Sequence, residues 1–289
     1  MASLIFKFLA RLSLRHLQSL GFIAGWLTYA LSPTYRRRLR ANLEQGLGAT
    51  AAAATWRRSV GEIGRQALEL PWMLLRPQTE LGAHVVQVSG WECVEAAEAM
   101  GGGILFITPH LGCFEITAQY FSLHKPITVL YRAPKKAVLQ PLIDAGRRRG
   151  NMRLAPADLG GVRRLVKALR AGEAVGMLPD QVPGAGEGAW LPFFGRPAYT
   201  MTLAARLSEV PGVSTIFAWA ERLPGGRGFH LRLRPPLKPL EGDTLTRAAA
   251  INRELEAQIQ ENPVQYLWGY NRYKRPSGAP PAPSAPDNR

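Results

Sequence analysis

The sequence contains little cysteine. Only Cys93 and Cys113 occur among its 289 residues, and neither belongs to a C-x-x-C pair or to a cluster of cysteine and histidine. Structural metal sites and disulfide frameworks depend on such clusters. We therefore expect no metal, no disulfide framework and a reducing compartment.

Acidic residues are also scarce, and none precedes Glu44. The chain has 36 Lys and Arg against 21 Asp and Glu, a formal net charge of +15. Such a surplus favours an anionic partner, which could be nucleic acid, membrane, a phosphorylated substrate or an acidic carrier protein. The positive charge is spread along the chain and no nucleic-acid-binding motif is present, so we expect no nucleic acid.

The N-terminal region has an apolar stretch of limited length, "HLQSLGFIAGWLTYALSPTY", at residues 16–35. A helix over residues 17–32 would be about 24 Å long, which is less than the ~30 Å hydrocarbon core of a membrane. A longer helix, extended toward the N-terminus, could span the core. It would then carry Lys7, Arg11 and Arg15 on one stripe, which is typical of a helix lying in the membrane interface.

Three interpretations of this region compete. A cleaved signal peptide is disfavoured by the following "RRRLR", because basic residues at that place resist translocation. A buried core helix stays open as the second interpretation. We expect the third, a membrane anchor over residues 1–35 that either spans the membrane or lies in its interface, with the main domain on the cytoplasmic side.

Residues 36–275 are predicted to form the main domain. Residues 36–80 are rich in helix formers, with breaks at Pro71 and Pro77. Short apolar runs then alternate with helical stretches, at residues 104–108, 127–131 and 174–178. This alternation predicts an α/β fold with a mostly parallel central sheet flanked by helices.

The C-terminal third is expected to add two strands, a long helix and a tail. The strands lie in "VSTIFAWAERLPGGRGFHLRLRPP" and are joined by a Gly-rich turn, and the helix ends at Asn262-Pro263. The Pro/Ala-rich residues 276–289 are expected to be disordered, because their composition cannot build a core.

Each of the three apolar runs ends in polar residues. The first leads into "PHLGCFE" with His110 and Glu115, the second into Arg132, and the third into Asp180 and Gln181. The carboxyl ends of parallel strands form one edge of a sheet, where ligands bind. These side chains are therefore expected to converge there.

The spacing of His110 and Glu115 constrains how they meet. Five residues apart on one helix, they would point about 140° apart. They can face each other only if His110 lies in the turn and Glu115 in the first turn of the following helix. A histidine oriented by a carboxylate can act as a general base toward a hydroxyl group. The alternative is a structural histidine at a strand end.

Several blocks of the sequence resemble the late, secondary acyltransferases of lipid A biosynthesis, in the glycerolipid acyltransferase superfamily. They are "RRRLRANL", "VSGWECVEAAEAMGGGILFITPHLGCFE", "LYRAP", "GRRRG", "LPDQ", "LPFFGRPAYT" and "PVQYLWGYNRYK". The resemblance covers nearly everything from the N-terminal apolar helix to Lys274.

The resemblance implies transfer of a fatty acyl chain from acyl carrier protein to a hydroxyl of a lipid A precursor at the inner membrane, without metal or cofactor. His110 would be the catalytic base and Glu115 would hold and polarise it. The substrate-binding residues would be Arg132, Arg147, Arg149, Asp180 and Gln181.

The chain departs from the family pattern at two places. Many members have His-Arg-Arg where this chain has Tyr270, Asn271 and Arg272, and Lys135 and Lys136 replace a more polar stretch. Both departures leave the acceptor and the acyl chain open. The His110–Glu115 pair is unaffected.

Other interpretations of the function stay open. One is acylation of a lysophospholipid or an amino-acid lipid, and another, of a different class, is a non-catalytic basic peripheral membrane protein. Cys113, three residues after His110, could serve as a nucleophile, although a free cysteine is more often a buried filler. Trp190, Phe193 and Phe194 are expected in the core rather than in an acyl pocket.

Overall fold

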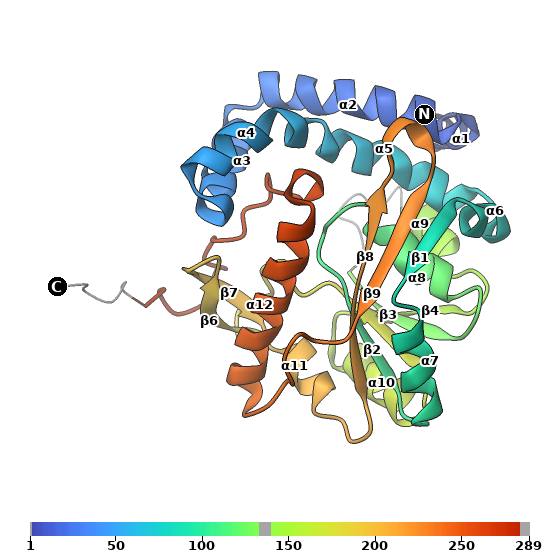
Figure 1. Ribbon diagram of the computed structural model, residues 1–289, viewed down its shortest axis with the longest axis vertical. Coiled ribbons are helices and arrows are strands. Elements are labelled where there is room, and N and C mark those ends of the chain that lie inside the picture. The colour runs from blue at the N-terminus through green and yellow to red at the C-terminus, as the bar shows by residue number, and fades with distance from the viewer. Residues whose placement is uncertain (1, 133–139, 284–289) are drawn as a thin grey trace.

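A seven-stranded sheet forms the centre of the molecule in the computed structural model, which describes residues 2–132 and 140–283 (Figure 1). Its order is β1-β9-β8-β2-β5-β3-β4. The strands are β1 (Val85–Ser89), β2 (Ile104–Ile107), β3 (Ile127–Tyr131), β4 (Met152–Pro156), β5 (Ala174–Met177), β8 (Ser214–Arg222) and β9 (Phe229–Arg234). All neighbours pair in parallel except β8 and β9, which are antiparallel. The predicted mostly parallel sheet is confirmed.

The two central strands are buried along their whole length. Every residue of β2, "ILFI", and of β5, "AVGM", is buried, as expected for strands covered by helices on both faces. Leu105 pairs with Val175 in the β2–β5 register, and β3 pairs with β5 in parallel. The carboxyl ends of β2, β3 and β5 therefore share one edge of the sheet, as predicted.

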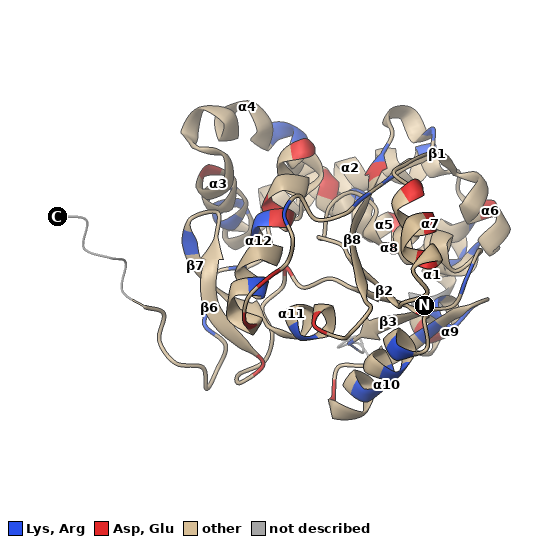
Figure 2. Cartoon of the chain, turned by 60° about the horizontal axis from the view of Figure 1, so that its bottom comes forward, with Lys and Arg blue, Asp and Glu red and all other residues tan. Residues whose placement is uncertain are grey.

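Helices and a small hairpin complete the main domain. The helices are α7 (Glu92–Ala99), α8 (Phe114–Phe121), α9 (Gln140–Arg147), α10 (Leu159–Arg170), α11 (Leu203–Ser208) and α12 (Thr244–Glu261), and the hairpin consists of β6 (Gly188–Phe193) and β7 (Arg196–Met201). The predicted strand pair β8–β9 and the long helix α12 are confirmed. Figure 2 shows Lys and Arg on elements throughout the fold, among them α3, α9 and α10.

The N-terminal residues form a layer of helices above the sheet edge (Figure 1). They are α1 (Ala2–Arg11), α2 (Leu14–Leu31), α3 (Pro33–Leu47), α4 (Ala49–Val60), α5 (Glu62–Leu75) and α6 (Gln78–Ala83). The expected break at Pro77 is present, but the break at Pro71 is wrong, because α5 continues through that proline.

Helix α2 lies against α5 at very close range. A Cβ atom on Gly64 would lie 1.9 Å from the carbonyl oxygen of Gly21, so no larger residue fits at the crossing without a shift. The buried face of α2 also carries Leu17 and Gln18. One face of α2 is therefore core, in agreement with the core-helix alternative.

The opposite face of α2 is apolar and exposed. It carries Leu20, Ile23, Leu27 and Leu31, spaced three or four residues apart as one stripe of a helix requires. Helix α1 adds three further exposed side chains, those of Leu4, Ile5 and Phe8. The chain is not one continuous helix here, because α1 ends at Arg11 and Ser13 caps α2. Within residues 2–132 and 140–283, no helix is both long enough and apolar enough to cross a membrane.

The first part of the C-terminal tail contacts the hairpin. Ala279 is 1% exposed and clusters with Tyr199, while the indole Nε1 of Trp190 donates a hydrogen bond to the carbonyl of Pro280 at 2.9 Å. The contact with the hairpin runs through Ala279 and Pro280, while Ser277, Gly278 and residues 280–283 are exposed. The disorder expected for residues 276–289 stays a prediction. Residues 284–289 lie outside the described residues.

Candidate active site

His110 lies in the loop that follows β2, at the shared edge of the parallel strands. Its main-chain carbonyl accepts a hydrogen bond from the N–H of Leu267 at 3.2 Å, and its ring packs on Phe114 with the centroids 4.7 Å apart. The side chain is 15% exposed and lines a cavity at this edge of the sheet. The expectation that His110 sits in the turn is confirmed.

Asp180 is the carboxylate that binds His110. Its Oδ1 lies 2.7 Å from the imidazole Nδ1, and its Oδ2 accepts the main-chain N–H of His110 at 2.9 Å. Asp180 follows β5, which is the direct neighbour of β2 in the sheet. The two contacts fix both the main chain and the ring of His110.

The charge state of Asp180 sets the tautomer of His110. Burial by itself raises the pKa of this carboxyl, but His110 and then Arg272 outweigh the burial and hold the pKa below its usual range. The carboxylate is therefore ionised and can only accept hydrogen bonds, so Nδ1 of His110 carries the proton. Whenever the imidazole is neutral, the lone pair is therefore on the other nitrogen, Nε2.

Glu115 has a different partner from the one expected. It lies in the first turn of α8, as predicted, but its Oε1 and Oε2 accept hydrogen bonds from Nε and Nη2 of Arg147, each at 2.7 Å. In the described residues, no hydrogen bond or ion pair joins Glu115 to His110. The expected direct contact is therefore wrong, because the two-pronged guanidinium of Arg147 occupies both carboxylate oxygens.

Three of the predicted substrate-binding residues line the cavity with His110 and Glu115: Arg132, Arg147 and Gln181. Arg132 is the most open of them, with a side chain 66% exposed and a long contact of 3.7 Å to Glu187. Asp180 lies behind His110 with a side chain only 1% exposed. The sheet edge thus assembles four of the five predicted residues around the histidine.

Arg149 does not join this group. Its guanidinium donates hydrogen bonds to the main-chain carbonyls of Gly146, Arg76 and Met73, the first at 2.7 Å and the last at 2.6 Å. It does not line the cavity. The prediction of a substrate-binding role is therefore not supported, because these carbonyls, at the ends of α5 and α9, take up its donors.

The cavity has a volume of about 490 Å³ and follows α8 along the face of the sheet. At the start of α8 it is lined by His110 and Phe114, and near the end of α8 by Phe121 and Trp91. Trp91 packs on Phe121 with ring centroids 6.1 Å apart. Between these ends the lining is mostly apolar, as suits a hydrocarbon chain.

The remaining candidates lie outside the cavity. Cys113 is 4% exposed, and burial raises the pKa of its thiol well above the ordinary value, so the reactive thiolate is disfavoured. Phe193 and Phe194 are buried in the core, as expected, and Trp190 packs on Tyr199. In the described part of the chain, no group of three or more metal-binding side chains is found.

Comparison of the sequence with known proteins places the chain in a family. The family model described as bacterial lipid A biosynthesis acyltransferase matches residues 3–275. The lipid A biosynthesis lauroyltransferase of Escherichia coli K12 is 31% identical over 201 residues, which are 68% of this chain and 65% of that protein.

Two further relatives come from the same organism. The lipid A biosynthesis palmitoleoyltransferase is 28% identical over 66% of this chain and 62% of its own length. The myristoyltransferase is 24% identical over 63% of this chain and 57% of its own length. The matched segments thus span slightly less than two thirds of each of these relatives. With nearly its whole length matched by the family model, the chain belongs to the bacterial lipid A biosynthesis acyltransferase family.

Proposed function

We propose that the protein transfers a fatty acyl chain from acyl carrier protein to a hydroxyl group of a lipid A precursor. The observation that carries the proposal is the His110–Asp180 pair at the mouth of an apolar cavity. An imidazole with a free lone pair is a general base, and the cavity can hold a fatty chain next to it. Family membership supports the lipid A acceptor.

His110 is the base in this mechanism. Its Nε2 takes the proton of the acceptor hydroxyl while the oxygen attacks the thioester carbonyl carbon of the donor. The new C–O bond forms, the C–S bond breaks, and the imidazolium returns the proton to the departing thiolate. Asp180 holds the reactive tautomer and stabilises the imidazolium, which is the task first assigned to Glu115.

Glu115 and Arg147 are charged residues that line the cavity and bind each other. Their two-pronged ion pair fixes the start of α8 against the end of α9, beside the histidine. Arg132 is exposed at the cavity mouth, where its guanidinium is available to a phosphate group of the acceptor. We assign Glu115 to positioning Arg147 and assign anion binding to Arg132.

The N-terminal helices are proposed to hold the enzyme at its lipid acceptor. The proposed membrane surface consists of the exposed apolar side chains of α1 and α2, and Arg36, Arg37 and Arg38 follow directly in α3. Apolar side chains beside basic residues suit a helix lying in an anionic membrane interface. The proposal places this surface on the cytoplasmic face of the inner membrane.

The test is transfer by the purified protein in detergent micelles. The substrates are a lipid A precursor that lacks its secondary chains and acyl carrier proteins loaded with single fatty acids. Mass spectrometry should detect the precursor with one added acyl chain, and His110→Ala should reduce its formation by about 10²–10⁴. A folded His110→Ala protein that transfers at the wild-type rate would overturn the mechanism.

The choice of acceptor is tested in the same assay. A lysophospholipid and an amino-acid lipid replace the lipid A precursor in parallel reactions, with the same donors. Acylation of either one, without acylation of the precursor, would replace the proposed acceptor. No transfer to any of the three would contradict the proposed enzyme activity.

A further inference from the structure

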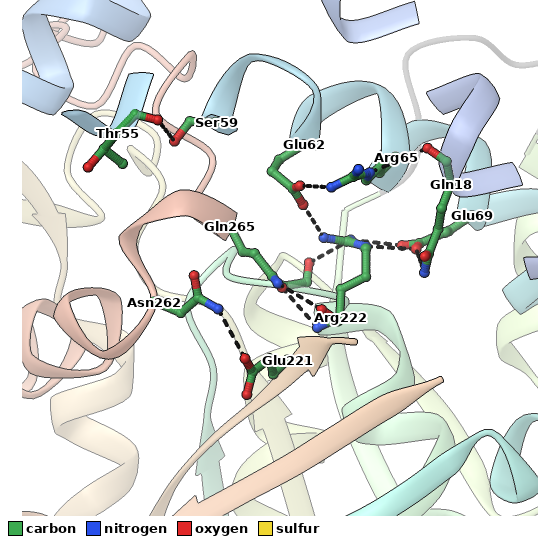
Figure 3. Close-up of polar contacts among 11 residues, drawn as sticks. Gln18, Thr55, Ser59, Glu62, Arg65, Glu69, Glu221, Arg222, Asn262 and Gln265 are labelled. Carbon is green, nitrogen blue, oxygen red and sulfur yellow. Dashed lines mark hydrogen bonds and ion pairs between the residues drawn. The ribbon is translucent and has the colours of Figure 1, made fainter. Parts of the chain in front are cut away.

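A second cluster of charged residues contacts the loop that carries His110 and does not line the cavity. Figure 3 shows its members Arg222, Glu62 and Glu69. Arg222, the last residue of β8, binds two carboxylates of α5. Its Nη1 donates to Oε2 of Glu62 at 2.6 Å, and its Nε and Nη2 donate to the two oxygens of Glu69 at 2.7 and 2.8 Å. The side chains of Arg222, Glu62 and Glu69 are 2%, 5% and 1% exposed.

The same guanidinium also reaches the main chain of the His110 loop. Nη2 of Arg222 donates a hydrogen bond of 3.1 Å to the carbonyl oxygen of Gly112. Gly112 has a φ of +59°, and a Cβ there would lie 2.0 Å from the carbonyl oxygen of Ala220. The loop therefore passes so close to β8 that only glycine fits, with its carbonyl turned toward Arg222.

Gln265 holds the loop from the other side. Its carbonyl accepts the N–H of Gly112 at 3.1 Å, and its side chain exchanges two hydrogen bonds with the main chain of Arg222, at 2.8 and 2.9 Å. The N–H of Cys113 donates to the carbonyl of Ala220 at 2.9 Å. Gly112 is thus fixed at both its N–H and its carbonyl, two residues after His110 and three before Glu115.

Stability alone does not explain this choice of residues. Burying an arginine and two glutamates costs desolvation, and apolar residues of similar size often serve stability equally well. Burial by itself lowers the pKa of Arg222, but Glu69 and Glu62 outweigh it and raise the pKa above its ordinary value. Arginine is the side chain whose planar fork can bind two carboxylates and a carbonyl at once.

We infer that Arg222, held by Glu62 and Glu69, is a positioning residue that fixes the His110–Glu115 loop through the carbonyl of Gly112. It does not line the cavity. Gln18 of α2 donates to Glu69 at 2.9 Å, so helix α2 is joined to the same cluster. The effect of the cluster on kcat rests on the proposed acyl transfer. Its effect on the conformation of the His110–Glu115 loop is independent of that proposal.

The test removes the hydrogen bonds of Arg222 to Glu62, Glu69 and Gly112 without leaving an unpaired charge in the buried cluster. Arg222→Met alone would leave Glu69 buried without a charged partner, although Glu62 would keep its ion pair with Arg65, and it could unfold the protein. The triple variant Arg222→Met/Glu62→Gln/Glu69→Gln is neutral and keeps the shapes of the side chains. We expect it to fold, while its kcat falls by about 10²-fold, as for a reacting group misplaced by about 1 Å, and its KM for the acyl donor stays within about threefold.

Arg222→Lys supplies an independent comparison. It keeps the positive charge beside Glu62 and Glu69, but its ammonium has three donors on one nitrogen, so it cannot reproduce the four hydrogen bonds of the Arg222 fork. Its kcat should fall as well. A matched control is Arg234→Met/Glu254→Gln, which removes a partly buried ion pair between β9 and α12 that, in the described residues, forms no hydrogen bond with residues 110–115. The control should keep the wild-type kcat.

Hydrogen exchange gives a readout that needs no activity. Mass spectrometry should show faster exchange of the amides at residues 111–114 in the triple variant, by about tenfold or more, and unchanged exchange in the control. Faster exchange in a protein without transfer activity would contradict the proposed function and leave this inference standing. A folded triple variant with wild-type exchange in the loop and wild-type kcat would overturn it.

Discussion

The imidazole Nδ1 of His110 lies 2.7 Å from Oδ1 of Asp180, a residue 70 positions further along the chain. The two follow neighbouring parallel strands, β2 and β5. The sheet register therefore creates the pair, and the nearer carboxylate in the chain, Glu115, binds Arg147 instead.

The first prediction concerns Asp180. Asp180→Asn keeps the size of the side chain but presents an amide that can no longer stabilise the imidazolium and that permits the wrong tautomer. We expect kcat to fall by about 10²–10⁴, with little change in KM. Steady-state kinetics with an acylated carrier protein measures this. Loss of an orienting carboxylate should leave far less than about a tenth of the wild-type kcat. An Asp180→Asn variant that kept more than this would show that Asp180 does not orient His110 for catalysis.

The second prediction separates Glu115 from Asp180. Because Glu115 and Arg147 act as one ion pair, Glu115→Gln and Arg147→Met should each lower activity, and the double variant should be no worse than the less active single variant. A double-mutant cycle on kcat/KM measures the coupling. Additive losses would mean that the two residues act separately. The same cycle between Glu115→Gln and Asp180→Asn should be closer to additive.

The third prediction concerns the thiol next to the base. Cys113→Ala removes a buried side chain that does not line the cavity, so the variant should keep most of its activity. Some stability should be lost, about 1 kcal/mol, since a small buried group is deleted. Rapid quench with mass spectrometry checks the chemistry. An acyl group trapped as a thioester on Cys113 would show a covalent route and contradict direct transfer.

The fourth prediction concerns acyl chain length. Trp91 lies at the end of the cavity away from His110, so Trp91→Ala should open that end and shift the preferred donor toward longer chains. Competition between acyl carrier proteins bearing chains of different length measures the shift. The matched control is Trp190→Ala, which removes an indole outside the cavity and should leave the preference unchanged. Equal preferences in all three proteins would exclude Trp91 from the chain-binding site.

The fifth prediction concerns membrane attachment. Ile23→Ser with Leu27→Ser places hydroxyl groups in the exposed apolar face of α2, and binding to vesicles containing anionic phospholipid should weaken by about tenfold or more. Cosedimentation measures the binding. Leu159→Ser with Leu237→Ser changes two exposed leucines elsewhere and should have no effect. High salt alone should not release the wild-type protein fully, because salt screens charges but leaves apolar burial intact.

The architecture of the main domain and the place of the site could be predicted from the order of residues alone. Fully apolar runs such as "ILFI" specify buried parallel strands, and polar residues after three of them specify one edge, because parallel strands end on the same side. For this reason the sequence predicts that His110, Arg132 and Asp180 lie at that edge. Glu115 does lie in the first turn of its helix, but the spacing required this only for a contact with His110 that the structure does not have.

The pairing of charged groups, in contrast, depended on the folded structure. Strand order put β5 beside β2, so Asp180 reached His110, while the end of α9 brought Arg147 to Glu115. The spacing of residues within one segment does not determine the strand order, because that order depends on how distant helices pack against the sheet. The same packing buries one face of α2 and also buries Arg222 next to the loop that carries His110. The sequence identifies each of these charged residues, but only the tertiary structure determines their partners. An ion pair forms between groups that are close in space, and such groups can be far apart in the chain.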